Sequence, residues 1–133
     1  MTESKVFRVA AYQAQSRPCT FEERLADLNV IAGKANGLGV DVLTFPECFL
    51  TGYFPDEASA RQSSIATDGS KFAQICKSTS GLSVTVIAGF TEQYEGRLYN
   101  SSAVIEGGKC RGIYRKSYLC YGYHTAGREY PVF

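Results

Sequence analysis

The segment Val84–Phe90 constrains the fold of this chain more than any other. Its sequence, VTVIAGF, is a nearly continuous run of β-branched and other apolar residues. A strand that faces water on one side alternates apolar with polar residues, whereas an unbroken apolar run is typical of a strand covered on both faces. The chain is therefore expected to build layers of secondary structure around a central strand.

Further strands are expected on either side of this segment. Tyr99–Glu106 and Lys109–Arg115 are two β-like runs, and Gly107-Gly108 between them suits the two-residue hairpin turn that needs positive φ. Two shorter apolar runs, Val6–Gln13 and Val40–Phe45, predict strands nearer the amino terminus.

A helix is expected between the first two strands. Phe21–Ala35 carries apolar residues at helical spacing. Thr20 and Glu23 have the spacing of a capping box, and Gly37 is placed to end the helix.

Asp68 or Ser70 is expected to cap a second helix that continues through Lys77, after a long loop that contains a helical turn at Asp56–Gln62. The resulting order, β-α-β-α-β-β-β, predicts an α/β fold with an antiparallel extension of the sheet. No linker or change of composition divides the chain, so residues 1–133 are expected to form one unit with no internal boundary.

Composition excludes several classes of protein. With 14 basic and 13 acidic side chains the net charge is +1, so no strong field would draw the chain to nucleic acid or to an anionic membrane. No apolar stretch approaches the ~18 residues that span a bilayer. Residues Met1–Lys5 are polar and show no leader, and five cysteines without a C-x-x-C pair suit a reducing compartment. A cytoplasmic location is expected.

Two charged residues stand where strands end. Glu47 follows Val40–Phe45 in the run FPECFLTGYFP, and Lys116 follows a β-like run in GIYRK. Reactive groups gather at the carboxyl ends of strands in open α/β sheets. A carboxylate and an ammonium in such positions are candidates for a catalytic pair.

Four segments in this order, FPE-x-FLTGY, VTVIAGF, LYNSSAVIE and IYRK, together resemble the N-terminal half of the nitrilase superfamily, the carbon-nitrogen hydrolases. The resemblance covers nearly the whole chain. It implies part of a four-layer α-β-β-α sandwich. It also implies hydrolysis of a small amide or nitrile to acid and ammonia, without metal or cofactor.

The resemblance also implies roles for individual residues. Glu47 matches the family's general base, and Lys116 matches the lysine that stabilises the oxyanion. Tyr53, in the LTGY turn, is a candidate for contact with substrate, although aromatic residues in turns more often serve packing.

The family's nucleophile is a cysteine some tens of residues after the lysine, and none of the five cysteines here has its context. Cys48 adjoins the base but is expected to point to the opposite face and to be a buried structural thiol. Cys120, in the loop after Lys116, is a weak candidate for a reactive thiol. The resemblance thus implies a C-terminally truncated domain, also shortened in the Ser117–Ala126 loop, which lacks the family's additional acidic residue.

Two other kinds of site are disfavoured by the pattern. His124 is the single histidine and has no ligand at zinc spacing. Gly33, Gly37 and Gly39 lie at or after the end of a helix instead of linking a strand to a helix, which is wrong for a nucleotide loop.

A non-catalytic alternative remains open. The chain could be a fragment or interaction module that pairs with itself or with a separate C-terminal half. A half-sandwich would expose an apolar sheet face, so a homo-oligomer or a partner chain is expected.

Overall fold

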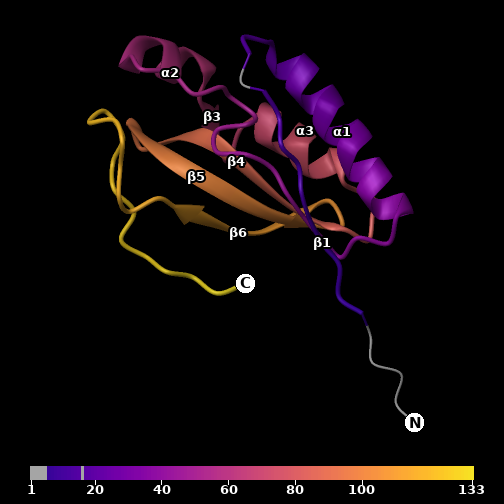
Figure 1. The fold of residues 1–133 in the computed structure, drawn as a ribbon. Helices are drawn as coiled ribbons and strands as arrows, with labels where there is room; N and C mark the ends of the chain where they lie inside the picture. The colour runs from indigo at the N-terminus through magenta and orange to yellow at the C-terminus, as the bar shows by residue number, and fades with distance from the viewer. Residues whose placement is uncertain (1–5, 16) are drawn as a thin grey trace.

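The computed structural model describes residues 6–15 and 17–133, and residues Met1–Lys5 therefore lie outside the described part. Helices cover one face of a six-stranded mixed sheet (Figure 1). The strands follow the order β1 (Val9–Ala11), β2 (Val42–Thr44), β4 (Thr85–Tyr94), β5 (Arg97–Glu106) and β6 (Lys109–Arg115), while the short β3 (Ile65–Ala66) pairs with the end of β4. The predicted α/β class is confirmed.

The strand directions bring the carboxyl ends of β2, β4 and β6 to the same end of the sheet. β1, β2 and β4 are parallel, and β5 runs antiparallel to both β4 and β6. The carboxyl ends of β2, β4 and β6 consequently point the same way. Residues that follow these strands can meet, although they are far apart in the chain.

Helix α1 (Phe21–Gly37) begins as the capping box predicts. The Thr20 hydroxyl accepts a hydrogen bond from the Glu23 amide at 3.2 Å, and the Glu23 carboxylate accepts one from the Thr20 amide at 2.7 Å. The helix continues two residues further than expected. Gly37 is its last residue, and Gly39 takes the left-handed conformation, with φ of 68°.

Helix α3 (Ser70–Ser78) starts differently from the prediction. Its N-cap is Gly69, which makes no side-chain cap, so the expectation of an Asp68 or Ser70 cap is wrong. The Gly69 amide donates to the Ala66 carbonyl at 3.0 Å, and a Cβ on Gly69 would lie 3.1 Å from that same oxygen. The tight turn after β3 therefore favours glycine at the cap. The expected turn at residues 56–62 is helix α2 (Glu57–Ser63), capped by Asp56.

The strands differ from their predicted lengths for a local reason. β1 and β2 are shorter than expected, whereas β4 extends to Tyr94 and β5 starts at Arg97. Glu95 and Gly96, with φ of 49° and 75°, form a hairpin turn that the sequence analysis missed. The predicted hairpin at Gly107-Gly108 is confirmed, with φ of 55° and 81°.

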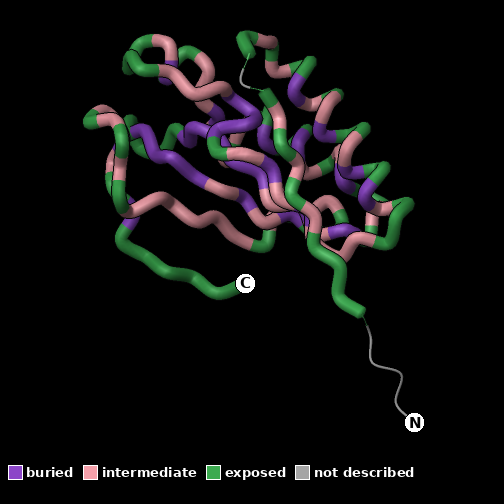
Figure 2. The backbone as a smooth tube through the Cα atoms, in the orientation of Figure 1, coloured by how far each residue is buried: buried purple, intermediate pink, exposed green. Residues whose placement is uncertain are grey.

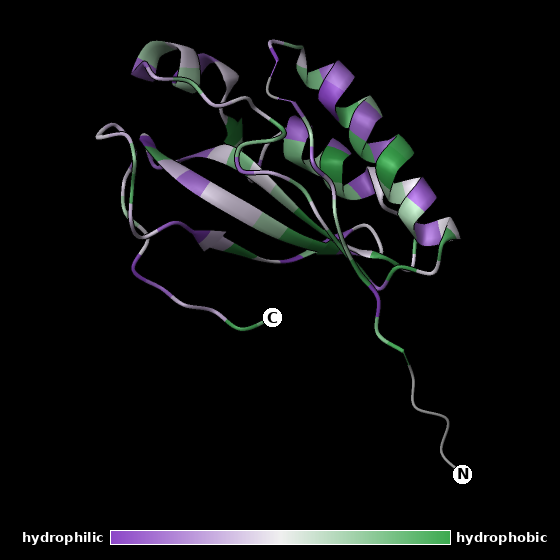
Figure 3. Ribbon diagram, viewed as in Figure 1, coloured by the Kyte–Doolittle hydropathy of each residue, from purple (hydrophilic) through white to green (hydrophobic). Residues whose placement is uncertain are grey.

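The core lies between the sheet and the helices, where Figure 2 shows buried backbone along β4 and β5. Hydrophobic and hydrophilic bands alternate along α1 in Figure 3, as expected for a helix with one face on a core. The buried set from the helices and the sheet includes Leu28, Ala32, Phe72, Ile75, Val86, Ala88, Phe90, Ala103 and Ile105.

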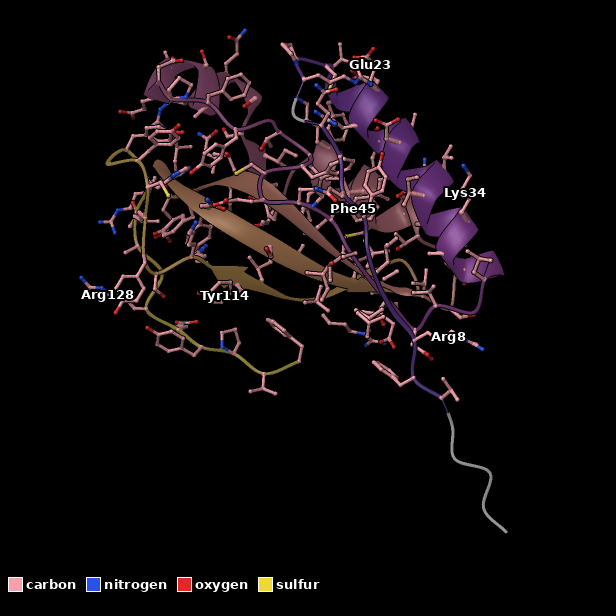
Figure 4. All side chains as sticks on the ribbon, viewed as in Figure 1. Arg8, Glu23, Lys34, Phe45, Tyr114 and Arg128 are labelled. Carbon is pink, nitrogen blue, oxygen red and sulfur yellow. The ribbon has the colours of Figure 1, made fainter. Side chains whose placement is uncertain are left out.

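The second sheet face is less covered than the apolar run VTVIAGF led us to expect. Ile87 and its cross-strand partner Val104 are half-buried, and Val9 at the sheet edge is 64% exposed. Tyr114 extends from β6 on the side away from the helices (Figure 4). Among the described residues this face has no helical layer.

The capping box provides a test of how α1 is stabilised. We expect Thr20→Ala to lower the free energy of unfolding by about 1 kcal/mol, because the Glu23 amide loses its acceptor. Urea denaturation measures the change. Ser70→Ala is the control, since its hydroxyl caps nothing in α3, and it should shift stability by less than about 0.5 kcal/mol. Equal losses in the two variants would contradict this assignment of the caps.

Candidate active site

Glu47 lies in a turn that leaves the sheet and returns to it. Before the turn, the Phe45 amide donates to the Ile87 carbonyl at 2.8 Å; after it, the Leu50 amide donates to the Gly89 carbonyl at 3.0 Å. The turn passes directly over Gly89, where a Cβ would lie 2.7 Å from the Cys48 amide nitrogen. Glycine at this point of β4 thus allows the loop to hold Glu47 above the sheet edge.

Lys116 and Asn100 meet the Glu47 carboxylate at this edge. Lys116 Nζ lies 2.7 Å from Glu47 Oε1, and Asn100 Nδ2 donates to the same oxygen at 2.6 Å. The Lys116 amide also donates to the Asn100 carbonyl at 2.8 Å, which continues the β5–β6 pairing. Among the described residues Glu47 Oε2 has no hydrogen-bond partner, so one carboxylate oxygen stays available.

The structure brings together the two residues that the resemblance singled out, and it adds a third. Glu47 and Lys116 are 69 positions apart in the sequence, and their side chains are 45% and 32% exposed. The sequence analysis missed Asn100, which is 6% exposed. The feature that could have revealed Asn100 is its amide side chain, which offers both a donor and an acceptor within the predicted strand LYNSSAVIE.

The ion pair changes the acidity of both partners. Partial burial alone would raise the pKa of the Glu47 carboxyl, but the hydrogen bonds from Lys116 and Asn100 outweigh it, and the pKa falls below its ordinary value. The hydrogen bond to Glu47 raises the pKa of the Lys116 ammonium against a smaller effect of desolvation. Both groups are therefore charged at neutral pH.

Cys48 is the thiol nearest to Glu47 in sequence, but it is poorly suited to react. The side chain is 1% exposed, and its Sγ lies 3.7 Å from both Thr91 Oγ1 and Asn100 Oδ1. Burial raises the pKa of this thiol to about 11, so the thiolate is scarce at neutral pH. The prediction of a buried thiol is confirmed; Cys120, by contrast, is exposed.

Tyr53 lies in an aromatic cluster beside this pair. Its ring centroid is 5.1 Å from that of Tyr121, which stacks on Tyr123 at 5.6 Å. The Tyr123 hydroxyl donates to the Phe54 carbonyl at 2.6 Å, which ties the 117–126 loop to the turn that carries Tyr53. Tyr53 and Glu47 both line a small cavity of about 50 Å³, together with Gln15 and Arg24. Tyr53 thus makes the packing contacts that are common for aromatic residues in turns. Its contact with substrate stays a prediction.

The loop after Lys116 is closed at its base. The Thr125 amide donates to the Leu98 carbonyl at 2.7 Å, and the Gly127 amide donates to the Lys116 carbonyl at 2.9 Å. Inside the loop, His124 is 6% exposed, and burial lowers the pKa of its imidazole, which favours the neutral form. The described residues contain no group of three or more His, Cys, Asp and Glu side chains placed to hold a metal ion.

Comparison with known proteins agrees with this geometry. The profile of the family described as carbon-nitrogen hydrolase matches residues 8–132. The chain belongs to the carbon-nitrogen hydrolase family. A glutamine-dependent NAD(+) synthetase from Thermotoga maritima is 34% identical over 112 residues, which cover 84% of this chain and 19% of that protein. An (R)-stereoselective amidase from Pseudomonas sp. is 34% identical over 69% of this chain and 32% of its own length.

Solved structures show the same fold. A CN-hydrolase superfamily protein from Xanthomonas campestris superposes with a TM-score of 0.76 at 19% identity, covering 92% of this chain and 47% of that one. An amidase from Nesterenkonia sp. gives a TM-score of 0.67 at 18% identity, covering 92% and 49%. The chain thus spans less than half of each of these relatives. Within the described residues, no helix is both long and apolar enough to cross a membrane.

The charge pair can be tested by titration. We expect Lys116→Met to raise the pKa of the Glu47 carboxyl, because the carboxylate loses both a hydrogen bond and a positive charge. Carbon-13 NMR of the glutamate carboxyls measures the shift. Lys109→Met, on the exposed start of β6, is the control and should leave the Glu47 pKa unchanged.

The same pair predicts a pH window for stability. The Glu47 contribution is present above the ordinary glutamate pKa of 4.5 and is lost as the pH falls through the lower folded value. The Lys116 contribution is present below 10.5 and is lost as the pH rises through the higher folded value. The stability difference between wild type and Lys116→Met should therefore shrink outside this window; a difference independent of pH would contradict the pairing.

Proposed function

We propose that this chain supplies the general base and the oxyanion-stabilising cation of an active site that hydrolyses a small amide or nitrile. The observation that supports the proposal is the Glu47 carboxylate held by Lys116 and Asn100, with Oε2 still available, where β2 and β6 end beside the β4–β5 hairpin. The amidase and the glutamine-dependent synthetase among the relatives are consistent with this chemistry.

In this proposal Glu47 takes the proton of a cysteine thiol, and the thiolate attacks the carbonyl carbon of an amide. The new C–S bond sends the C=O π electrons to oxygen, and Lys116 stabilises the resulting oxyanion. When the oxyanion collapses, the C–N bond breaks, and ammonia leaves with the proton that Glu47 held. Water then attacks the thioester, Glu47 accepts its proton, and the thiol is regenerated with release of the acid.

We further propose that the reacting thiol comes from a segment or partner outside these 133 residues. Cys48 is buried and its high pKa keeps it protonated. Cys120 is exposed on the loop after Lys116, and it is the alternative that the experiment below addresses.

The second candidate function is an interaction module without catalysis of its own. Val104 and Ile87 are half-buried on the helix-free face, Val9 is 64% exposed, and Phe7 beside it is also 64% exposed. These residues favour a second chain or a further segment against this face. The two functions are compatible, because a covering partner could bring the thiol.

The catalytic proposal is tested by ammonia release from a panel of small amides and nitriles. We expect the purified 133-residue chain to release no more ammonia than its Glu47→Gln variant. An assembly isolated from source cells with the tagged chain should hydrolyse at least one substrate, and Glu47→Gln should slow that reaction about 10²–10⁴-fold, the usual contribution of general acid-base catalysis.

Two outcomes would change this conclusion. Hydrolysis by the chain alone that disappears in both Glu47→Gln and Cys120→Ser would make Cys120 the nucleophile. An active assembly that is indifferent to Glu47→Gln would refute the proposed role of Glu47.

The association proposal is tested by sedimentation and light scattering. We expect the chain to form an oligomer at tens of micromolar or to co-purify with a partner, and Val104→Lys to weaken the association by placing a charge on the helix-free face. Val30→Lys is the matched control, because Val30 is 55% exposed on α1 on the opposite side of the molecule.

A monodisperse monomer that unfolds cooperatively at this concentration, with no bound partner, would refute the association. So would equal effects of the two lysine substitutions.

A further inference from the structure

We propose that an ion pair on the helix-covered face of the sheet, between the buried Glu92 carboxylate and the partly exposed Arg115, positions Lys116 against Glu47. Arg115 would thus be a positioning residue that acts through its neighbour in the chain. The inference rests on the proposed role of Lys116, but it concerns the placement of that side chain and can be measured without turnover.

Strand alternation places two polar clusters back to back. Thr91 and Asn100 are cross-strand partners, and so are the next residues along the hairpin, Glu92 and Tyr99. Neighbouring residues of a strand point to opposite faces. Asn100 and Lys116 accordingly belong to the site, while Glu92, Tyr99 and Arg115 belong to the face that carries Phe90 and the helices.

The Glu92–Arg115 pair is fixed in both distance and orientation. Glu92 is 1% exposed, and its two oxygens accept from Arg115 Nη2 at 2.7 Å and Nε at 2.8 Å. Ser101 donates a further hydrogen bond to Glu92 Oε2 at 2.7 Å. The guanidinium lies over the rings of Tyr99 and Tyr94, at 4.0 and 4.6 Å. Two parallel hydrogen bonds and two ring contacts leave this side chain little freedom.

This anchor lies at the end of β6, where the chain leaves the sheet. Arg115 is the last residue of β6, its backbone pairs with Ser101, and the chain then leaves the sheet for the 117–126 loop. A cavity of about 650 Å³, bounded by Arg97 and by residues 125–129, lies against Arg115, so its ion pair and its ring contacts hold the side chain on this side of the strand. Ends of strands open easily without such contacts.

A positioning role also explains why the fold buries the Glu92 carboxylate here, beside an arginine that is 31% exposed. A buried ion pair contributes little stability compared with apolar residues of similar size, but it specifies one geometry. Fixing Arg115 fixes the backbone of Lys116, whose amide bonds to Asn100 at 2.8 Å and whose Nζ reaches Glu47 at 2.7 Å. The pair therefore determines where the ammonium stands.

The test compares two double variants of the 133-residue chain. Each replaces one glutamate and one arginine by methionine, so the net charge is unchanged. Glu92→Met with Arg115→Met removes the Glu92–Arg115 pair, and Glu106→Met with Arg111→Met removes an exposed pair of the same 2.7 Å distance between the end of β5 and β6. The readout is the rate of Lys116 acetylation by a limiting amine reagent, measured by mass spectrometry relative to Lys34 and Lys77. The titration of the Glu47 carboxyl is measured in parallel.

We expect Lys116 to react about threefold faster without the Glu92–Arg115 pair, which corresponds to a fall of about half a unit in its pKa. The pKa of Glu47 should rise, because its carboxylate loses the hydrogen bond from the Lys116 ammonium. The exposed-pair variant should change neither value. Loss of stability alone, with β4 and β5 still folded by amide NMR, would move neither readout.

An unchanged Lys116 rate and Glu47 pKa in the folded Glu92/Arg115 variant would overturn the inference. If that variant does not fold, Ser101→Ala decides, since it removes one hydrogen bond from Glu92 and should accelerate Lys116 acetylation in the same direction but less. A response of Lys116 together with hydrolysis that is indifferent to Glu47→Gln would leave the positioning intact and refute the proposed function instead.

Discussion

The antiparallel pairing of β4 with β5 is the contact on which the rest of the structure depends. Its register sets Thr91 opposite Asn100 and Glu92 opposite Tyr99, so one hairpin carries polar groups on both faces of the sheet. On one face Asn100 donates a hydrogen bond to Glu47, in the turn after β2. On the other face Glu92 accepts hydrogen bonds from Arg115, at the end of β6. A one-residue slip would exchange the two sets of side chains and remove both contacts.

Local patterns were sufficient to predict much of this arrangement. The α/β class, the extent of α1 to within two residues and the Gly107-Gly108 hairpin follow from apolar periodicity, a capping box and positive-φ glycines. Glu47 and Lys116 stood out because each directly follows a strand, and the resemblance to a family supplied their roles. These are properties that a short window of sequence records.

The misses concern one contact between distant residues and two turns with unusual residue choices. Asn100 became a site residue only when the register of β5 brought it to Glu47, 53 positions earlier in the chain. The Gly69 cap depends on how β3 joins the end of β4, and the extension of β4 depends on a turn that includes Glu95, a residue rarely chosen for positive φ. No local pattern specifies the partner of Asn100, and the two turns lack the usual turn residues or caps, so sequence periodicity alone could not have found them.

The helix-free face links assembly to chemistry, because the Glu47 site and the uncovered apolar residues share it. In the uncovered chain, hydrogen bonds from Lys116 and Asn100 outweigh burial and keep the pKa of Glu47 low, while its side chain is 45% exposed. A general base works best with a pKa nearer to the working pH. Covering this face would remove water from the carboxylate and raise its pKa, whereas the two hydrogen bonds would persist. In the proposed assembly, the same layer that buries Ile87 and Val104 would therefore also bring Glu47 closer to the acidity that proton transfer requires.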